Sequence, residues 1–300
     1  MEFGKLEDLS GVDWSLPEDR FATSFKRTPG KLEIFLGSPA WGNSQWIGKI
    51  YPKKTPSEKF LYHYSRQFNC IELNTSHYRI PDDFTTQSWL SEVPENFIFC
   101  PKVNKEISHG KFGLTDQHLL RQWTDFLHNL GSHVGPSFIQ FHELFSYENR
   151  QILFRFLESW PQEFQLSIEL RHASWFKNHE VLPALVEYLG RKGIGLVITD
   201  VAGRRDVLHS SHLVEWSMLR LIGNNLGPSD KERISSWADR FQKWELEGLK
   251  KVYLFLHQPD DILTIEFARL VQQILSSRGF EIKSDFKLEE EKDLFNYGTL

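Results

Sequence analysis

Eight short apolar segments recur along this chain, and in at least six of them charged or hydrogen-bonding residues occupy one alternating face. The segments span residues 34–41, 69–78, 97–103, 137–143, 166–175, 194–200, 218–224 and 252–258. Because successive side chains of a β-strand point to opposite faces, the apolar and polar sets must face different environments. Burying a charge without a partner is costly, so a sheet with this many inward polar groups is expected to use them.

Stretches with helical character separate the strand-like segments. Helices are expected at 56–68, 116–130, 146–159, 179–192, 229–247 and 261–277, and a shorter helix or turn at 82–90. Gly193 and Gly248 stand where two of these helices should end, because glycine readily adopts the left-handed conformation that closes a helix. Strands that alternate with helices predict a parallel sheet, and eight strands is the number that closes a barrel.

The chain is therefore predicted to be an α/β protein built as a single TIM-type (β/α)8 barrel with parallel strands over residues 32–280. Residues 1–31 are expected to form an N-terminal extension, and residues 281–300 an acidic C-terminal tail. An open doubly wound sheet is the alternative arrangement, although no G-x-G-x-x-G loop supports a dinucleotide-binding version of it.

Composition limits the classes of partner. Hydrophobic residues make up 40% of the chain and charged residues 25%, which is ordinary for a soluble globular protein. The formal net charge of −5 disfavours nucleic acid as a partner, although it does not exclude a local basic groove. Cys70 and Cys100 are expected to be buried core thiols in a reducing compartment. No signal peptide and no apolar run of the ~18 residues needed to span a membrane occurs, so a cytoplasmic protein without membrane contact is expected.

In a closed barrel, functional groups gather at the C-terminal ends of the strands and in the loops that follow. The segments place acids, bases, amides and aromatic residues there. The candidate catalytic residues are Glu72, Glu169, Lys102 and Asp200. The candidate ligand-binding residues at the same strand ends are Trp41, Asn74, Tyr78, Arg79, Gln140, His142, Arg171, His172, Trp175, Arg220 and His257.

These residue types indicate acid/base chemistry on a small anionic molecule. Two carboxylates with flanking histidines suit proton transfer, and Glu72 and Glu169 are the expected acid/base pair. Three cations in the same mouth (Lys102, Arg171 and Arg220) suit a phosphate or carboxylate. The tryptophans offer flat faces on which a sugar ring or a base could stack.

Each residue also has a purely structural explanation. Glu72 could pair with Lys102 on the neighbouring strand, and Glu169 with Arg171 inside the barrel. Asp200 could cap the helix that follows it, and the histidines could be hydrogen-bonded core residues. Together, however, charged or amide side chains on at least five strands depart from the Val, Ile and Leu layers that normally fill a barrel. That departure favours a functional pocket.

No metal and no cofactor is predicted. Acidic and histidine side chains could in principle converge on an ion. However, no H-E-x-x-H motif or other compact ligand spacing appears, and three cations in one mouth would oppose a divalent ion. A P-loop and a G-x-S-x-G nucleophile elbow are absent as well.

Several blocks of the sequence resemble the YecE-like family, catalogued as domain of unknown function 72. The matching blocks are GSPAW (37–41), WIGKIYP (46–52), FNCIELNTSHYRIP (68–81), Trp89, NFIFCPKVNKEISH (96–109), GPSFIQF (135–141), IELRHASW (168–175) and ITD (198–200). The resemblance implies a TIM barrel with a shared pocket. The residues that it assigns to that pocket are Trp41, Glu72, Asn74, Tyr78, Arg79, Lys102, His109, Gln140, Glu169, Arg171, His172, Trp175 and Asp200.

The C-terminal third departs from the family pattern. LRLIGN (219–224) keeps Arg220 but lacks the usual histidine, and FLHQPDD (255–261) replaces an asparagine-rich ending, so the roles of Asn224 and His257 stay open. The family has no established reaction to carry over. The leading hypothesis is an enzyme that acts on a small anionic, sugar-like or nucleotide-derived ligand. The alternatives are a nucleic-acid-processing protein related by fold to metal-dependent repair nucleases and a non-catalytic metabolite-binding protein.

Overall fold

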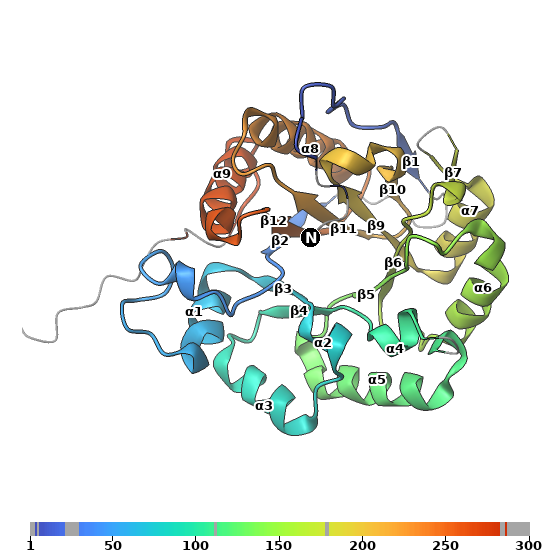
Figure 1. Cartoon of the computed structure of the whole chain (residues 1–300), viewed down its shortest axis with the longest axis horizontal. Helices are drawn as coiled ribbons and strands as arrows, with labels where there is room; N and C mark the ends of the chain where they lie inside the picture. The colour runs from blue at the N-terminus through green and yellow to red at the C-terminus, as the bar shows by residue number, and fades with distance from the viewer. Residues whose placement is uncertain are drawn as a thin grey trace, which may run out of the picture.

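The computed structural model describes residues 4, 6–21, 30–110, 113–177, 180–282 and 286 of the chain. Its eight central strands are β2 (Glu33–Gly37), β3 (Cys70–Leu73), β4 (Ile98–Pro101), β5 (Ser137–Gln140), β6 (Leu166–Glu169), β9 (Gly195–Asp200), β11 (Trp216–Ile222) and β12 (Lys251–His257). Six of them form a parallel sheet in the order β2–β12–β11–β9–β6–β5, and β3 and β4 form a parallel pair. Figure 1 shows the helices arranged around the outside of these strands. The α/β prediction is confirmed in this form.

The helices match the predicted ones closely. They are α1 (Phe60–Gln67), α2 (Thr75–Tyr78), α3 (Asp83–Glu92), α4 (Lys105–Ser108), α5 (Gln117–Leu130), α6 (Arg150–Ser159), α7 (Pro183–Lys192), α8 (Pro228–Leu246) and α9 (Thr264–Ser277). Short 3-10 helices are η1 (Ser44–Trp46), η2 (Ser57–Lys59), η3 (Gly113–Thr115), η4 (Gly131–His133), η5 (Tyr147–Asn149), η6 (Ala173–Trp175), η7 (Ala202–Val207) and η8 (Asp261–Leu263). Gly193 and Gly248 do adopt positive φ, 68° and 93°, where α7 and α8 end.

The strands are shorter than the apolar segments that predicted them. The segment 69–78 leaves the sheet after Leu73 and turns into α2, and the segment 166–175 leaves it after Glu169 and turns into η6. The polar residues after these points therefore lie in loops above the strands. This geometry moves several predicted side chains away from the sheet.

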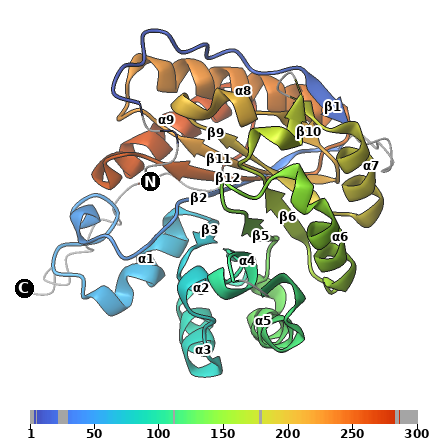
Figure 2. The same cartoon turned by 45° about the vertical axis from the view of Figure 1, so that its right-hand side comes forward.

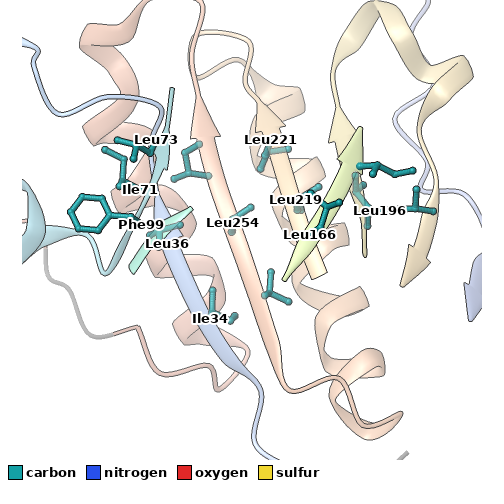
Figure 3. Close-up of a cluster of buried hydrophobic side chains, with 14 of the residues drawn as sticks. Ile34, Leu36, Ile71, Leu73, Phe99, Leu166, Leu196, Leu219, Leu221 and Leu254 are labelled. Atoms are coloured by element: carbon teal, nitrogen blue, oxygen red, sulfur yellow. The ribbon is translucent and has the colours of Figure 1, made fainter. Parts of the chain in front are cut away.

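Two apolar layers cover the two faces of the strands. The outer layer lies between strands and helices, and Figure 3 shows part of it, with Ile34, Leu36 and Leu254 on neighbouring strands. A second cluster covers the inner face of the strands. It consists of Phe35, Cys70, Cys100, Phe138, Val197, Val214, Trp216, Met218, Tyr253 and Phe255. The two cysteines are buried and unbridged, as predicted. The inner cluster stops below the C-terminal ends of the strands, where polar residues replace it.

The predicted closed barrel is not confirmed, because regular pairing is interrupted at two seams. At the first seam, between β2 and β3, Glu72 N donates to Ser38 O at 3.1 Å. The Asn69 side chain takes the place of further backbone pairing there, since its Oδ1 accepts from Leu36 N (2.6 Å) and its Nδ2 donates to Ile34 O (3.2 Å).

The second seam lies between β4 and β5. Isolated bridges join Phe99 to Val134 and Lys102 to Phe138, with backbone hydrogen bonds of 2.8 Å from Gly135 N to Phe99 O and from Val103 N to Phe138 O. Strands approach closely at both seams. A Cβ on Gly37 would lie 2.6 Å from Cys70 O, and one on Gly135 would lie 2.5 Å from Ile98 Cγ2.

The N-terminal segment packs along α8 before the first central strand begins. In Figures 1 and 2 it runs beside this helix and ends in β1 (Asp19–Phe21), which pairs in parallel with β10 (Ser210–His212). Arg240 Nη2 donates to Pro17 O at 3.0 Å, and Trp244 Nε1 donates to Asp19 Oδ1 at 3.1 Å. A short antiparallel pair, β7 (Phe176–Lys177) and β8 (Glu180–Val181), follows η6.

The predicted tail over 281–300 lies largely outside the described residues, since only 281, 282 and 286 are described there. Across the part of the chain that the structure describes, every helix is too short or too polar to cross a membrane.

Gly37→Ala tests the close approach at the first seam. The added methyl group would meet the Cys70 carbonyl, so the variant should lose about 1–3 kcal/mol of unfolding free energy, the usual cost of overpacking. Gly42→Ala is the matched control, because nothing lies within 4 Å of a Cβ there. Equilibrium urea unfolding measures both. Equal stability of the two variants would contradict the described seam.

Candidate functional site

A cavity of about 570 Å³ lies at the C-terminal ends of the central strands. Each of the eight strands contributes a residue from its end or from the loop that follows. These residues are Pro39, Asn74, Lys102, Gln140, Arg171, Val201, Gly223 and Gln258. Among the predicted site residues, the cavity is lined by Asn74, Tyr78, Lys102, Gln140, Arg171, Arg220 and His257. The parallel strands therefore bring distant parts of the sequence to one place.

Arg220 on β11 is the centre of the polar layer beneath this cavity. Its Nε and Nη2 donate to Glu72 Oε2 (2.9 Å) and Oε1 (3.0 Å), and its Nη1 donates to Glu169 Oε2 (3.0 Å). The guanidinium also lies over the Phe138 ring, with 5.7 Å from Cζ to the centroid. One arginine thus joins two buried carboxylates from β3 and β6 on top of the inner apolar cluster.

Glu72 accepts two further hydrogen bonds. Asn74 Nδ2 donates to Oε1 at 2.9 Å, and His257 Nε2 lies 2.9 Å from Oε2. Because an ionised carboxylate can only accept, His257 Nε2 must carry the hydrogen. Each Glu72 oxygen consequently has two donors. Lys102 is not among them, so the pairing of Glu72 with Lys102 considered from the sequence does not occur.

Glu169 is held by donors from three strands or their loops. Besides Arg220, Arg171 Nε donates to Oε1 at 2.9 Å and Gln140 Nε2 donates to Oε2 at 2.8 Å. Because the amide nitrogen of Gln140 is directed at Glu169, its oxygen faces the other way and accepts from Lys102 Nζ at 2.9 Å. The predicted ion pair between Glu169 and Arg171 is confirmed.

The neighbouring cations decide the charge state of both carboxylates. Burial raises the pKa of Glu169, but Arg220 and Arg171 lower it by a larger amount, so that the pKa is about 2. Burial likewise opposes ionisation of Glu72, and Arg220 and His257 outweigh it, so the pKa of Glu72 falls well below its ordinary value. Both glutamates are therefore ionised at neutral pH, and neither exchanges protons there.

Lys102 has the opposite environment. Burial and the Arg220 guanidinium lower its pKa to about 8, against the raising effects of Glu72 and Glu169. Arg171 also lowers the pKa of Lys102. The pKa of an ordinary lysine is about 10.4. The charge of Lys102 therefore changes close to neutral pH.

The cavity wall and the layer behind it carry different charges. Lys102, Arg171 and Arg220 line the cavity, whereas Glu72 and Glu169 lie behind them and do not. The acidic side chains that do line it, Glu7 and Asp261, are exposed and belong to the N-terminal segment and to η8 at the rim. The floor therefore presents cations and hydrogen-bond donors.

Asp200 lies outside the cavity, so its prediction as a catalytic residue needs correction. On β9 it shares a face with Leu196 and Ile198, which belong to the outer apolar layer. Its carboxylate meets Arg233 Nη2 (2.8 Å), Arg205 Nη1 (2.5 Å) and Trp237 Nε1 (2.7 Å). Burial raises the pKa of Asp200 and the two arginines lower it, with a net decrease. Asp200 joins β9 to α8 and η7.

Four other predicted residues also lie away from the cavity lining. Trp175 is fully buried on η6 and stacks on Phe145, and Trp41 packs edge-on against Trp89. Arg79 is exposed, and His172 caps η6 by accepting from Ser174 N. These residues follow their strands by several positions, and the turns that begin there carry them outwards. Trp41 and Trp175 therefore do not offer their faces to a ligand in this cavity.

His109 and His142 line a second cavity of about 560 Å³ between α4 and α6. Their ring centroids lie 5.9 Å apart. Burial lowers the pKa of His109, and His142 and Lys102 lower it further. Among the described residues, no group of three His, Cys, Asp or Glu side chains is arranged to hold a metal ion.

Sequence reasoning missed part of the cavity wall. Gln258 accepts through Oε1 from Asn225 N at 2.7 Å and fixes the loop after β11. Leu6 and Leu9 from the N-terminal segment also line the cavity. The loop carried a weak signal, since Asn224 and Asn225 lie between Gly223 and Gly227, but the N-terminal segment has no periodicity that would place it there.

Comparison with known proteins gives one family. A family model described as "Protein of unknown function DUF72" matches residues 35–290. UPF0759 protein YecE of Escherichia coli K12 is 25% identical over 280 residues, which cover 87% of this chain and 100% of the relative. UPF0759 protein YunF of Bacillus subtilis is 26% identical over 152 residues, or 48% of this chain and 52% of the relative.

Solved structures agree with this match. A DUF72 family protein from Thermotoga maritima superposes with a TM-score of 0.66 at 20% identity, covering 81% of this chain and 99% of the other. A DUF72 family protein from Enterococcus faecalis gives a TM-score of 0.65 at 20% identity, covering 84% and 99%. At this level of identity the likeness concerns the fold.

Arg220→Met tests the role of the central arginine. The change leaves Glu72 and Glu169 buried without their shared counter-charge, so the unfolding free energy at pH 7 should fall by about 3–5 kcal/mol. In the wild type, the contribution of Glu169 is present above its ordinary pKa of 4.5 and is lost as the pH falls towards about 2. In the variant the pKa values of Glu72 and Glu169 should both lie above the ordinary value of a glutamate. The stability difference should therefore shrink as the pH falls below about 4.5.

Arg79→Met is the control for this experiment, because Arg79 is an exposed arginine. It should change the stability by less than about 0.5 kcal/mol. Urea unfolding between pH 3 and pH 8 measures both variants. A penalty for Arg220→Met that is small, or that does not depend on pH, would contradict the assignment.

Asp200→Asn tests whether this carboxylate is structural. Removing its charge takes the carboxylate partner from Arg205 and leaves buried Arg233 with only Asp230, 3.5 Å from its Nη1. This loss should cost about 3–5 kcal/mol of unfolding free energy. The exposed ion pair of Asp239 and Arg278 supplies the control, and Asp239→Asn should cost at most about 1 kcal/mol. Sulfate titration calorimetry should give the same result for both variants as for the wild type. A loss of affinity in folded Asp200→Asn would return Asp200 to the site.

Proposed function

Since the chain belongs to the DUF72 family, whose description assigns no activity, we propose its function from the chemistry of the cavity. The family resemblance drawn from the sequence motifs is thereby confirmed. We propose an enzyme that binds a small anionic ligand at the C-terminal ends of the strands. The ligand would be a sugar-like or nucleotide-derived molecule that carries a phosphate or a carboxylate.

We further propose that the eight central strands form a TIM-type barrel with two irregular seams. All eight strands run in parallel pairs or sheets, and individual backbone hydrogen bonds cross both interruptions. All eight also contribute to the rim of one cavity. This is the position that active sites occupy in barrels of this type.

One observation carries the proposed ligand class. The cavity floor presents Lys102, Arg171 and Arg220, while the carboxylates that balance them lie behind the wall. Charge-assisted hydrogen bonds from such cations are the strong contacts of phosphate and carboxylate sites. The arrangement supports an anion that would approach from the open side and meet donors first.

The roles expected within the cluster need a different division. Glu72 and Glu169 were expected to form the acid/base pair. However, each accepts hydrogen bonds on both carboxylate oxygens and stays ionised near neutral pH. We propose that the two glutamates orient and charge the arginines. Lys102, with its pKa of about 8, would be the group that exchanges protons with the ligand.

Sulfate binding tests this proposal, because sulfate keeps its charge across the neutral range. Lys102→Met and Arg171→Gln should each weaken binding by about tenfold or more, since each removes a charge-assisted hydrogen bond worth roughly 1.5–3 kcal/mol. Titration calorimetry at constant ionic strength measures the affinity. Lys53→Met is the control, because Lys53 is exposed and lies outside the cavity lining.

The same titration has an expected pH dependence. The charged and titratable groups that act on Lys102 are Glu72, Glu169, Arg171, Arg220, His77 and His109, and His257 lines the same cavity. Burial lowers the pKa of His77 to about 4, and the pKa of His109 is lowered as well, so both histidines are neutral above pH 7. Wild-type affinity should fall as the pH rises through about 8, and Lys102→Met should remove that step. Absence of sulfate binding, or equal affinity in all variants, would overturn the proposal.

A further inference from the structure

Lys102 stands out among the cavity cations because its hydrogen-bond partner is neutral. Within the described residues, its Nζ donates to the amide oxygen of Gln140 at 2.9 Å and forms no ion pair. Gln140 cannot turn its nitrogen towards Lys102 without losing the hydrogen bond that it donates to Glu169. The amide is therefore held in the orientation that accepts from Lys102.

The two nearby carboxylates are already engaged by arginines. Glu72 accepts from Nε and Nη2 of Arg220, and Glu169 accepts from Nη1 of Arg220 and Nε of Arg171. A lysine placed only to balance buried charge would occupy one of these oxygens. Lys102 instead extends from the end of β4 into the cavity, where a ligand can reach its nitrogen.

Two arginines already give the floor permanent positive charge. Arginine stays protonated throughout the working range of proteins, so anion binding alone does not require that the third cation be titratable. A desolvated lysine beside other cations is, however, the arrangement that activates an amine as a nucleophile. The position of Lys102 thus fits covalent chemistry better than charge balance.

We propose that Lys102 forms an imine with the carbonyl carbon of an anionic aldehyde or ketone, whose anionic group is held by Arg171. The inference rests on the proposed function and names its substrate class. It also states what distinguishes Lys102 from the two arginines beside it.

The step is balanced without any co-reactant. The Nζ lone pair forms a C–N bond to the carbonyl carbon, and the carbonyl oxygen takes the two amine hydrogens and leaves as water. The imine nitrogen then takes a proton from solvent, and the resulting cation draws electrons from the neighbouring carbon. This electron withdrawal favours proton removal or C–C cleavage at that carbon.

The charge state of Lys102 is compatible with this step. With a pKa of about 8, roughly a fifth of the lysine is unprotonated at pH 7.4, against about one part in a thousand for an ordinary lysine. The nucleophilic form is therefore present at neutral pH while the arginines remain charged.

The test is reductive trapping of the full-length protein with glyoxylate, the smallest anionic aldehyde, and cyanoborohydride. Peptide mass spectrometry then compares labelling at Lys102 with labelling at exposed Lys53 in the same sample. Lys102 should be labelled at least tenfold faster at pH 7, sulfate should slow that labelling, and its rate should rise through about pH 8. With propionaldehyde, which has no charge, most of the difference in labelling rate between Lys102 and Lys53 should disappear.

Two variants make the outcome decisive. Lys102→Arg keeps the cation and should abolish labelling at this position while sulfate still binds, and Lys102→Met should abolish labelling and weaken sulfate binding about tenfold. Labelling of wild-type Lys102 no faster than Lys53, with sulfate binding intact, would overturn the imine and leave the proposed function standing. Failure of both sulfate binding and labelling would overturn both proposals.

Discussion

The interaction on which the rest of the site depends is the bridge from Arg220 to Glu72 and Glu169. Three strands that are far apart in the sequence, β3, β6 and β11, each contribute one charged group to it. Two anions and a cation are acceptable in this buried layer because Glu72 accepts four hydrogen bonds, Glu169 accepts three, and each guanidinium nitrogen of Arg220 donates to a carboxylate. Removing any one of them would leave a charge in an apolar surrounding, directly above Phe138 and the inner cluster.

This bridge also determines what the cavity can do. Because the arginines occupy the carboxylates, Lys102 Nζ has only the Gln140 amide as a hydrogen-bond partner among the described residues. The same arginines lower its pKa by charge repulsion, in addition to burial. A structural ion-pair network and a reactive lysine are therefore two consequences of one arrangement. The glutamates act on the cavity through the cations that they hold, without lining it themselves.

The sequence allowed good prediction wherever strand alternation was visible. Glu72 alternates with Ile71 and Leu73, and Glu169 with Ile168 and Leu170, so their inward direction could be read from the residues alone. Asp200 ends a strand that is buried on both faces, and apolar residues on both sides hide the alternation. Trp175 could not be placed, because its position depends on the turn after β6. The contribution of Leu6 and Leu9 depends on long-range packing along α8, which no local pattern encodes.

The most direct test of the central claim is a crystal soaked with selenate, whose selenium can be located by anomalous scattering. The account predicts a peak within hydrogen-bond reach of Lys102 Nζ and Arg171, above the layer formed by Glu72, Arg220 and Glu169. An occupied selenate only on the outer surface, with the strand-end cavity empty at saturating concentration, would contradict it.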